Sequence, residues 1–247
     1  MHPDLSQHRD KNKIFILGSG YSINSIPKSM WTKLEKHTTI AFNWFCFHNF
    51  EPSIYIVREQ ANIKKRQNKQ ETVPNFINKL KSYKNTSIIV SDVSRHSPQA
   101  YKYKDHSFIK NNSTILRDTK CKTEMSIQQL INTLTENAFE SKKCFHGDKK
   151  TACSLVNALH IAMSLNPKEI IFLGVDLYDS KYFWMKENKT RHTVRNKGQT
   201  FKSRHATHNR AIHLVRCMKK TKYTFISGVK KSLLNSIIDY KNIKELV

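Results

Sequence analysis

The sequence predicts an α/β fold, in which a mostly parallel, Rossmann-like sheet carries helices on both faces. Short apolar runs rich in Ile, Val and Phe alternate along the 247 residues with longer segments of helical period. Strands that alternate with helices form parallel sheets covered on both sides. Hydrophobic residues make up 38% of the chain and aromatic residues 10%, which is enough apolar surface for a sizeable core. We expect residues 1–247 to form a single domain.

Six apolar runs have the length and composition of buried strands, namely residues 13–17, 38–42, 53–57, 86–91, 169–174 and 223–227. Helical period predicts helices over residues 123–138, 151–165, 204–219 and 230–239. In the second of these, one face collects Leu155, Leu159, Ala162 and Met163. The polar, basic stretch 179–203 has little apolar periodicity. Long excursions of this kind are usually lids or disordered segments, so we expect a lid-like insertion there.

The chain is strongly basic. It holds 43 Lys and Arg against 19 Asp and Glu, a net charge of +24, which indicates an acidic partner. No nucleic-acid-binding motif organises the basic residues, so we favour peripheral contact with an anionic membrane over nucleic acid. The first residues contain no apolar stretch typical of a signal peptide, and the five cysteines have no CxxC spacing. We therefore expect reduced thiols and a cytoplasmic protein, at most attached to the inner face of the membrane.

Polar residues stand at the ends of several predicted strands, namely Ser19, Asn43, Arg58 and Asp176. Parallel sheets bind ligands beyond the carboxyl ends of their strands, where the strand order reverses. We therefore expect these four residues to line the site. Ser19 lies in the turn Gly18-Ser19-Gly20, directly after the first strand. The position favours backbone N–H groups that face a phosphate or ribose, and a plain tight turn is the alternative.

Several familiar motifs are absent. The glycine turn has Ile23 where a dinucleotide fingerprint has its third glycine, and it lacks the GK[ST] of a Walker loop. No DxD motif occurs; Asp176 and Asp179 lie three residues apart, but a strand-end or turn-capping role is favoured over metal binding. His205 and His208 have no carboxylate or Cys at ligand spacing. We expect neither a metal nor a cofactor.

Five segments, in one order along the chain, carry a family resemblance. They are ILGSGYSI from Ile16, IAFNWF from Ile40, TACS from Thr151, KEIIFLGVDLY from Lys168 and SRHATHNRAIHL from Ser203. With these motifs the chain resembles the bacterial sialyltransferases that build lipooligosaccharide from a cytidine monophosphate (CMP) sugar donor. The resemblance implies an inverting, metal-independent glycosyltransferase with a nucleotide-binding domain, a lid and a tendency to form homo-oligomers.

The resemblance also implies roles for individual residues. It makes His205 the general base and assigns the hydroxyl groups of Tyr178 and Tyr182 to the leaving phosphate. The expected donor-binding site combines residues that match the family's donor-binding positions with polar residues at the strand ends. They are Gly18, Ser19, Gly20, Asn43, Arg58, Thr151, Ser154 and Asp176. We expect Phe183 and Trp184 to anchor the lid rather than to stack on a sugar.

The implied chemistry is consistent with these residue types. CMP leaves as a phosphate monoester, which carries less charge than a diphosphate, so hydroxyl donors can replace a metal. The activated sugars carry a carboxylate at the anomeric carbon, for which Arg58 or Asn43 is a suitable partner. A histidine with a pKa of about 6.5 suits removal of a proton from the acceptor hydroxyl.

Other activities remain open from the sequence. Two enzyme alternatives use the same fold: transfer of 3-deoxy-octulosonate from its CMP form, and diphosphate transfer as in the pterin diphosphokinase-like proteins. A third alternative, motivated by the charge of +24, is a protein that binds nucleic acid or anionic membranes without catalysis.

Overall fold

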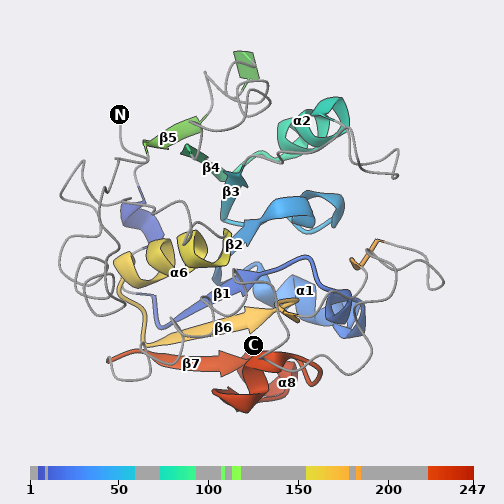
Figure 1. The fold of residues 1–247 in the computed structure, drawn as a ribbon, viewed down its shortest axis with the longest axis vertical. Helices are drawn as coiled ribbons and strands as arrows, with labels where there is room; N and C mark the ends of the chain where they lie inside the picture. Colours follow the sequence, from blue (N-terminus) through green and yellow to red (C-terminus); the bar gives the residue numbers. More distant parts are fainter. Residues whose placement is uncertain are drawn as a thin grey trace.

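The computed structural model describes an eight-stranded sheet at the centre of the protein (Figure 1). The described residues are 5–8, 11–58, 73–92, 107–108, 113–117, 154–177, 182–184 and 222–247. The strands are β1 (Lys13–Leu17), β2 (Thr38–Phe42), β3 (Ile54–Arg58), β4 (Ser87–Asp92), β5 (Ser113–Arg117), β6 (Glu169–Leu173), β7 (Thr224–Ser227) and β8 (Asp239–Tyr240). Each pair of neighbouring strands is parallel.

The strand order reverses between β1 and β6. Across the sheet the order is β5-β4-β3-β2-β1-β6-β7-β8, so the chain extends the sheet from β1 in one direction and from β6 in the other. At the carboxyl end of β1, Leu17 lies between Ala41 of β2 and Leu173 of β6. The predicted α/β fold with a parallel, Rossmann-like sheet is confirmed. The carboxyl ends of β1, β2 and β6 are where sheets of this kind bind ligands.

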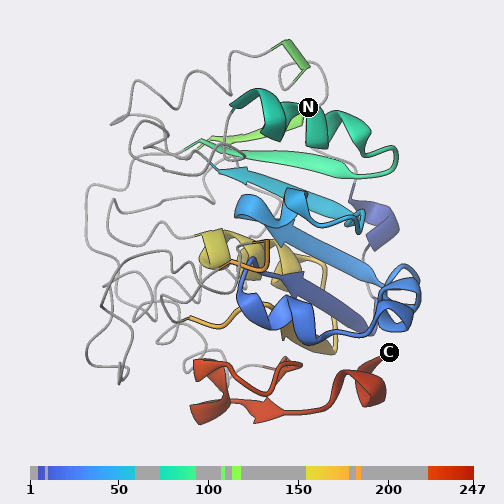
Figure 2. The same cartoon turned by 90° about the vertical axis from the view of Figure 1, so that its right-hand side faces the viewer.

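Alternate residues of β1, β2, β3, β6 and β7 enter two separate cores, one on each face of the sheet. In β1, Ile14 and Ile16 belong to one core, whereas Phe15 and Leu17 belong to the other. The first core is covered by α6 (Ser154–Ser164), and the second by α1 (Lys28–Leu34), α2 (Val73–Ser82) and the 3-10 helix η3 (Asn43–Phe47). Figures 1 and 2 show α6 on the opposite side of the sheet from α1 and α2. Burial on both faces explains why the strands are continuous apolar runs.

Helix α6 buries the apolar face that the sequence predicts, which consists of Leu155, Leu159, Ala162 and Met163. The helix ends at Ser164. Two residues later Asn166 adopts a left-handed conformation, with φ at 57°, and the following Pro167 cannot continue a helix. Within the described ranges, neither α6 nor any other helix is long and apolar enough to cross a bilayer.

The predicted helix at residues 230–239 is wrong. The structure instead has a short 3-10 helix, η7 (Leu233–Ser236), followed by β8, which pairs with β7. The Ser232 hydroxyl caps η7 by accepting from the Leu234 N–H at 3.1 Å, and it donates to the Val175 carbonyl at 2.6 Å. These hydrogen bonds and the β8 pairing override a helical pattern that sequence alone favoured.

Most other predicted elements agree with the structure where it describes them. The strands predicted at 13–17 and 38–42 have those bounds, and the strands predicted at 53–57 and 86–91 are β3 and β4, shifted by one residue. The sequence did not predict α1, α2, β5, β8 or the short helices η1 (Ser6–His8), η3 and α8 (Ile243–Leu246). The helices predicted at 123–138 and 204–219 lie outside the described residues.

Candidate functional site

The glycine turn joins the carboxyl ends of β1 and β6. The Gly18 N–H donates to the Leu173 carbonyl at 2.7 Å, and the Gly20 N–H donates to the Gly174 carbonyl at 2.8 Å. A Cβ atom at Gly18 would overlap the Gly174 carbonyl group. Gly174 has a backbone φ of 66°, which residues other than glycine rarely adopt. It also packs against the Ile23 side chain. The two strand ends therefore approach each other too closely for any side chain between them.

A buried carboxylate occupies the inner side of this turn. Asp176 is 5% exposed and accepts hydrogen bonds from the Ser22 N–H at 3.1 Å and from the Ser22 hydroxyl. Burial raises the pKa of Asp176, and hydrogen bonds from Ser22 and from the Tyr21 backbone partly oppose that change. The N–H groups of Gly18, Gly20, Tyr21 and Ser22 thus bond to protein oxygen atoms. At these four residues the N–H groups do not face a ligand phosphate or ribose, which agrees with the alternative of a plain tight turn.

Ser19 connects the turn to β2. Ser19 is 6% exposed, and its hydroxyl donates to the Phe42 carbonyl at 3.4 Å, at the carboxyl end of β2. Its own carbonyl accepts from the Phe183 N–H at 3.4 Å. The structure therefore places Ser19 at the predicted edge of the sheet, with its hydroxyl directed at the backbone.

Asn43 stands at the carboxyl end of β2, where η3 begins. It adopts a left-handed conformation with φ at 57° and is half-buried. The Ser154 hydroxyl, from the first residue of α6, donates to Asn43 Oδ1 at 2.7 Å. The Tyr55 hydroxyl, from β3, donates to the Asn43 backbone carbonyl. Two predicted donor-binding residues that are 111 positions apart, Asn43 and Ser154, are therefore in contact.

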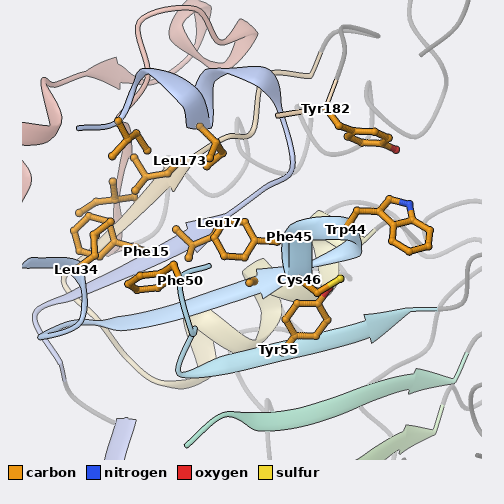
Figure 3. Close-up of a cluster of buried hydrophobic side chains, with 14 of the residues drawn as sticks. Phe15, Leu17, Leu34, Trp44, Phe45, Cys46, Phe50, Tyr55, Leu173 and Tyr182 are labelled. Atoms are coloured by element: carbon orange, nitrogen blue, oxygen red, sulfur yellow. The ribbon is translucent and has the colours of Figure 1, made fainter. Parts of the chain in front are cut away.

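Residues 182–184 lie against the glycine turn and against η3. Tyr182 forms an antiparallel bridge with Gly20, and the Asn24 side-chain amide donates to the Phe183 carbonyl at 2.8 Å. Tyr182 is 9% exposed, and its ring stacks on Trp184 with ring centroids 4.3 Å apart. Figure 3 shows Tyr182 and Trp44 at the same end of the aromatic core. These contacts place Phe183 and Trp184 against the glycine turn and η3, and their predicted role as anchors of a lid stays a prediction.

His48 is part of the same aromatic cluster. Its ring lies 4.2 Å from Trp31 and 5.5 Å from Phe183, measured between centroids. Its Nδ1 atom accepts from the Phe50 N–H at 3.0 Å, so this nitrogen carries no proton. Burial lowers the pKa of His48 to about 4, because a charged imidazole would lose its hydration among these rings.

The low pKa of His48 predicts a loss of stability in acid. In the unfolded chain a histidine has a pKa of about 6.5, so between pH 6.5 and pH 4 the unfolded chain binds a proton that the folded chain excludes. His48 therefore disfavours folding progressively as the pH falls through that window. We expect His48→Phe to remove roughly 1–2 kcal/mol of this acid destabilisation, after allowance for solvent screening at a half-buried ring.

Urea unfolding of the two proteins at pH 7 and at pH 4.5 measures the effect. The remaining histidines and carboxyl groups are common to both proteins and cancel in the difference. An unfolding free energy that falls equally in both proteins would contradict this account of His48.

Several predicted site residues lie outside the described residues. These are Tyr178, His205, Thr151 and, within the predicted lid, residues 179–181 and 185–203. For Arg58 the structure describes the backbone alone, which lies at the end of β3 and pairs with Ser91 of β4. Their predicted roles stay predictions.

Sequence reasoning missed two residues that shape the site, Tyr55 and Ser22. Tyr55 lies inside an apolar strand, and Ser22 is one of several polar residues after the glycine turn. No motif in the sequence marks either residue, because the pairing of Tyr55 with Asn43 and of Ser22 with Asp176 exists only in the folded chain.

No group of three or more His, Cys, Asp or Glu side chains in the described ranges could hold a metal ion. No protein-family model matches this chain, and no curated protein matches it either. The motifs of the sequence and the geometry of the sheet edge are therefore the basis for a functional assignment.

Proposed function

We propose that this protein is an inverting glycosyltransferase that moves a nonulosonic acid such as sialic acid from a CMP donor to a cell-surface glycan acceptor. The observation that carries the proposal is the contact between Asn43 and Ser154 at the carboxyl edge of the sheet. It lies beside the point where the strand order reverses, which is the ligand-binding position of parallel sheets. Both residues belong to motifs that resemble the sialyltransferases.

The donor phosphate binds near the start of α6 rather than at the glycine turn. The N–H groups of Gly20 and Ser22 bond to protein oxygen atoms, and the Asp176 carboxylate behind them repels a phosphate. The first N–H groups of an α-helix have no partner within the helix, and they carry a partial positive charge. Helix α6 begins at Ser154, next to Asn43. Thr151 and Ser154, which match donor-binding positions, belong to the same segment.

In the reaction, His205 removes the proton of the acceptor hydroxyl while the oxygen of that hydroxyl forms a bond to the anomeric carbon of the donor sugar. The bond from that carbon to the phosphate oxygen breaks on the opposite face, and its electron pair leaves with CMP. The Tyr178 and Tyr182 hydroxyls donate hydrogen bonds to the departing phosphate. Each preorganised donor of this kind contributes about 3–4 kcal/mol to the transition state. The donor carboxylate is held by Arg58, which leaves the amide of Asn43 for the phosphate.

The first test is nucleotide release by the purified chain. We expect CMP to be released from CMP-sialic acid, faster with a glycan acceptor than without, and CMP to raise the melting temperature of the protein. Parallel reactions with CMP-3-deoxy-octulosonate and with ATP distinguish the two other enzymes proposed for this fold. An absence of both CMP release and any thermal shift with cytidine nucleotides would refute the proposal.

The charge of +24 favours a peripheral, cytoplasmic location for this enzyme at an anionic membrane that presents a lipid-linked acceptor. Sedimentation with vesicles of phosphatidylserine, compared with neutral phosphatidylcholine vesicles, separates this partner from nucleic acid. A protein that binds duplex or single-stranded DNA with a steep salt dependence, and turns over no CMP-sugar, would favour the nucleic-acid alternative.

A further inference from the structure

The backbone of Asn43 is in a conformation that is unfavourable for any residue with a side chain. Its φ of 57° lies in the left-handed region, although Asn tolerates this region better than most residues. Such outliers persist where the surrounding structure holds them, and they concentrate at functional sites. Asn43 stands at the end of β2, on the ligand-binding edge of the sheet.

Two buried hydroxyl groups from different elements hold Asn43 in this conformation. The Tyr55 hydroxyl bonds to the backbone carbonyl of Asn43, and the Tyr55 side chain has no exposed surface. Figure 3 shows Tyr55 beneath η3, beside Cys46. Ser154 is 6% exposed, and its hydroxyl donates to Asn43 Oδ1. One hydroxyl thus restrains the backbone of Asn43, and the other restrains its side chain.

The hydrogen bond from Ser154 determines which end of the Asn43 amide meets a ligand. Because Oδ1 accepts from Ser154, the Nδ2 group is the end that remains to contact a ligand. Within the described part of the chain, Nδ2 makes no hydrogen bond. Asn43 is half-buried rather than enclosed, so Nδ2 can donate to a bound molecule. A ligand group at this position must therefore be a hydrogen-bond acceptor.

We propose that Tyr55 and Ser154 are positioning residues that preorganise the Asn43 amide to donate to an anionic oxygen of the bound nucleotide. Tyr55 is buried beneath η3 and acts only through Asn43. Ser154 acts by orienting the amide. This inference rests on the proposed function, since it takes the CMP phosphate as the anionic group. It predicts that loss of either hydroxyl weakens recognition of the phosphate more than recognition of the nucleoside.

The test compares the affinities of CMP and cytidine by isothermal titration calorimetry in four variants. We expect Tyr55→Phe and Ser154→Ala to weaken CMP about tenfold, the effect of losing one charge-assisted hydrogen bond, and to change cytidine affinity little. Ser154→Thr keeps a hydroxyl and is expected to restore CMP affinity. Tyr83→Phe is the matched control, because its ring lies 5.9 Å from that of Tyr55 and its buried hydroxyl makes no hydrogen bond in the described structure.

The outcomes separate the inference from the proposed function. A wild-type protein that binds neither CMP nor cytidine overturns the proposed function and the inference with it. A wild-type protein that binds CMP, with Tyr55→Phe and Ser154→Ala retaining the same preference for CMP over cytidine, overturns the inference alone. If Tyr55→Phe does not fold, the comparison of Ser154→Ala with Ser154→Thr decides.

Discussion

Replacement of His205 by alanine is expected to lower the turnover of CMP-sialic acid by about 10²- to 10⁴-fold, with CMP affinity unchanged. Under the proposed function, His205 removes a proton from the acceptor hydroxyl as that oxygen attacks, and a positioned base contributes a factor of this size. This role requires no contact between His205 and the nucleotide, so we expect binding of CMP to be retained. The measurement is initial rate at saturating donor and acceptor, together with titration of CMP by calorimetry.

His208→Ala is the matched control for His205→Ala, since it removes a histidine three positions along the same motif. We expect it to retain most of the turnover. The pH profile gives a second reading: the wild-type rate should rise with pH as the base loses its proton, and His205→Ala should lack that rise. Unchanged turnover in His205→Ala, or a larger loss in His208→Ala, would assign the base to another residue.

Replacement of Gly18 by alanine is expected to lower the free energy of unfolding by about 3 kcal/mol or more. The added Cβ atom would overlap the Gly174 carbonyl, which is backbone and cannot rotate away. Relief of the overlap has to separate β1 from β6, and this breaks the bonds from Gly18 to Leu173 and from Gly20 to Gly174. Urea unfolding of the variant and the wild-type protein measures the difference.

Gly228→Ala is the comparison that isolates the cause. The nearest atom to a Cβ at Gly228 is Leu173 Cδ2, at 2.5 Å, which is the end of a flexible side chain. Leu173 can change rotamer, so we expect a loss of about 1 kcal/mol. Equal losses in the two variants would mean that the contact with backbone at Gly18 is not the decisive feature.

The strands that lie deepest in the sheet were predicted from the sequence with their bounds. Residues 13–17 and 38–42 contribute side chains to both cores, so burial on two faces leaves a continuous apolar run that is visible in the sequence. Helix α1 was missed, because it has only seven residues and buries only Met30 and Leu34. The segment after Lys230 was predicted wrongly, because the hydrogen bond from Ser232 to the distant Val175 and the pairing of β8 with β7 decide its conformation.

The sequence by itself determined the parallel α/β fold and the edge of the sheet at which Ser19, Asn43 and Asp176 gather, because apolar periodicity and strand ends are local properties of the chain. Only the tertiary structure decided what these residues do there. It directs the carboxylate of Asp176 to Ser22, 154 positions away, and it holds Asn43 between Tyr55 and Ser154. Each of these contacts forms between elements that the fold brings together, and none leaves a trace in the spacing of residues along the chain.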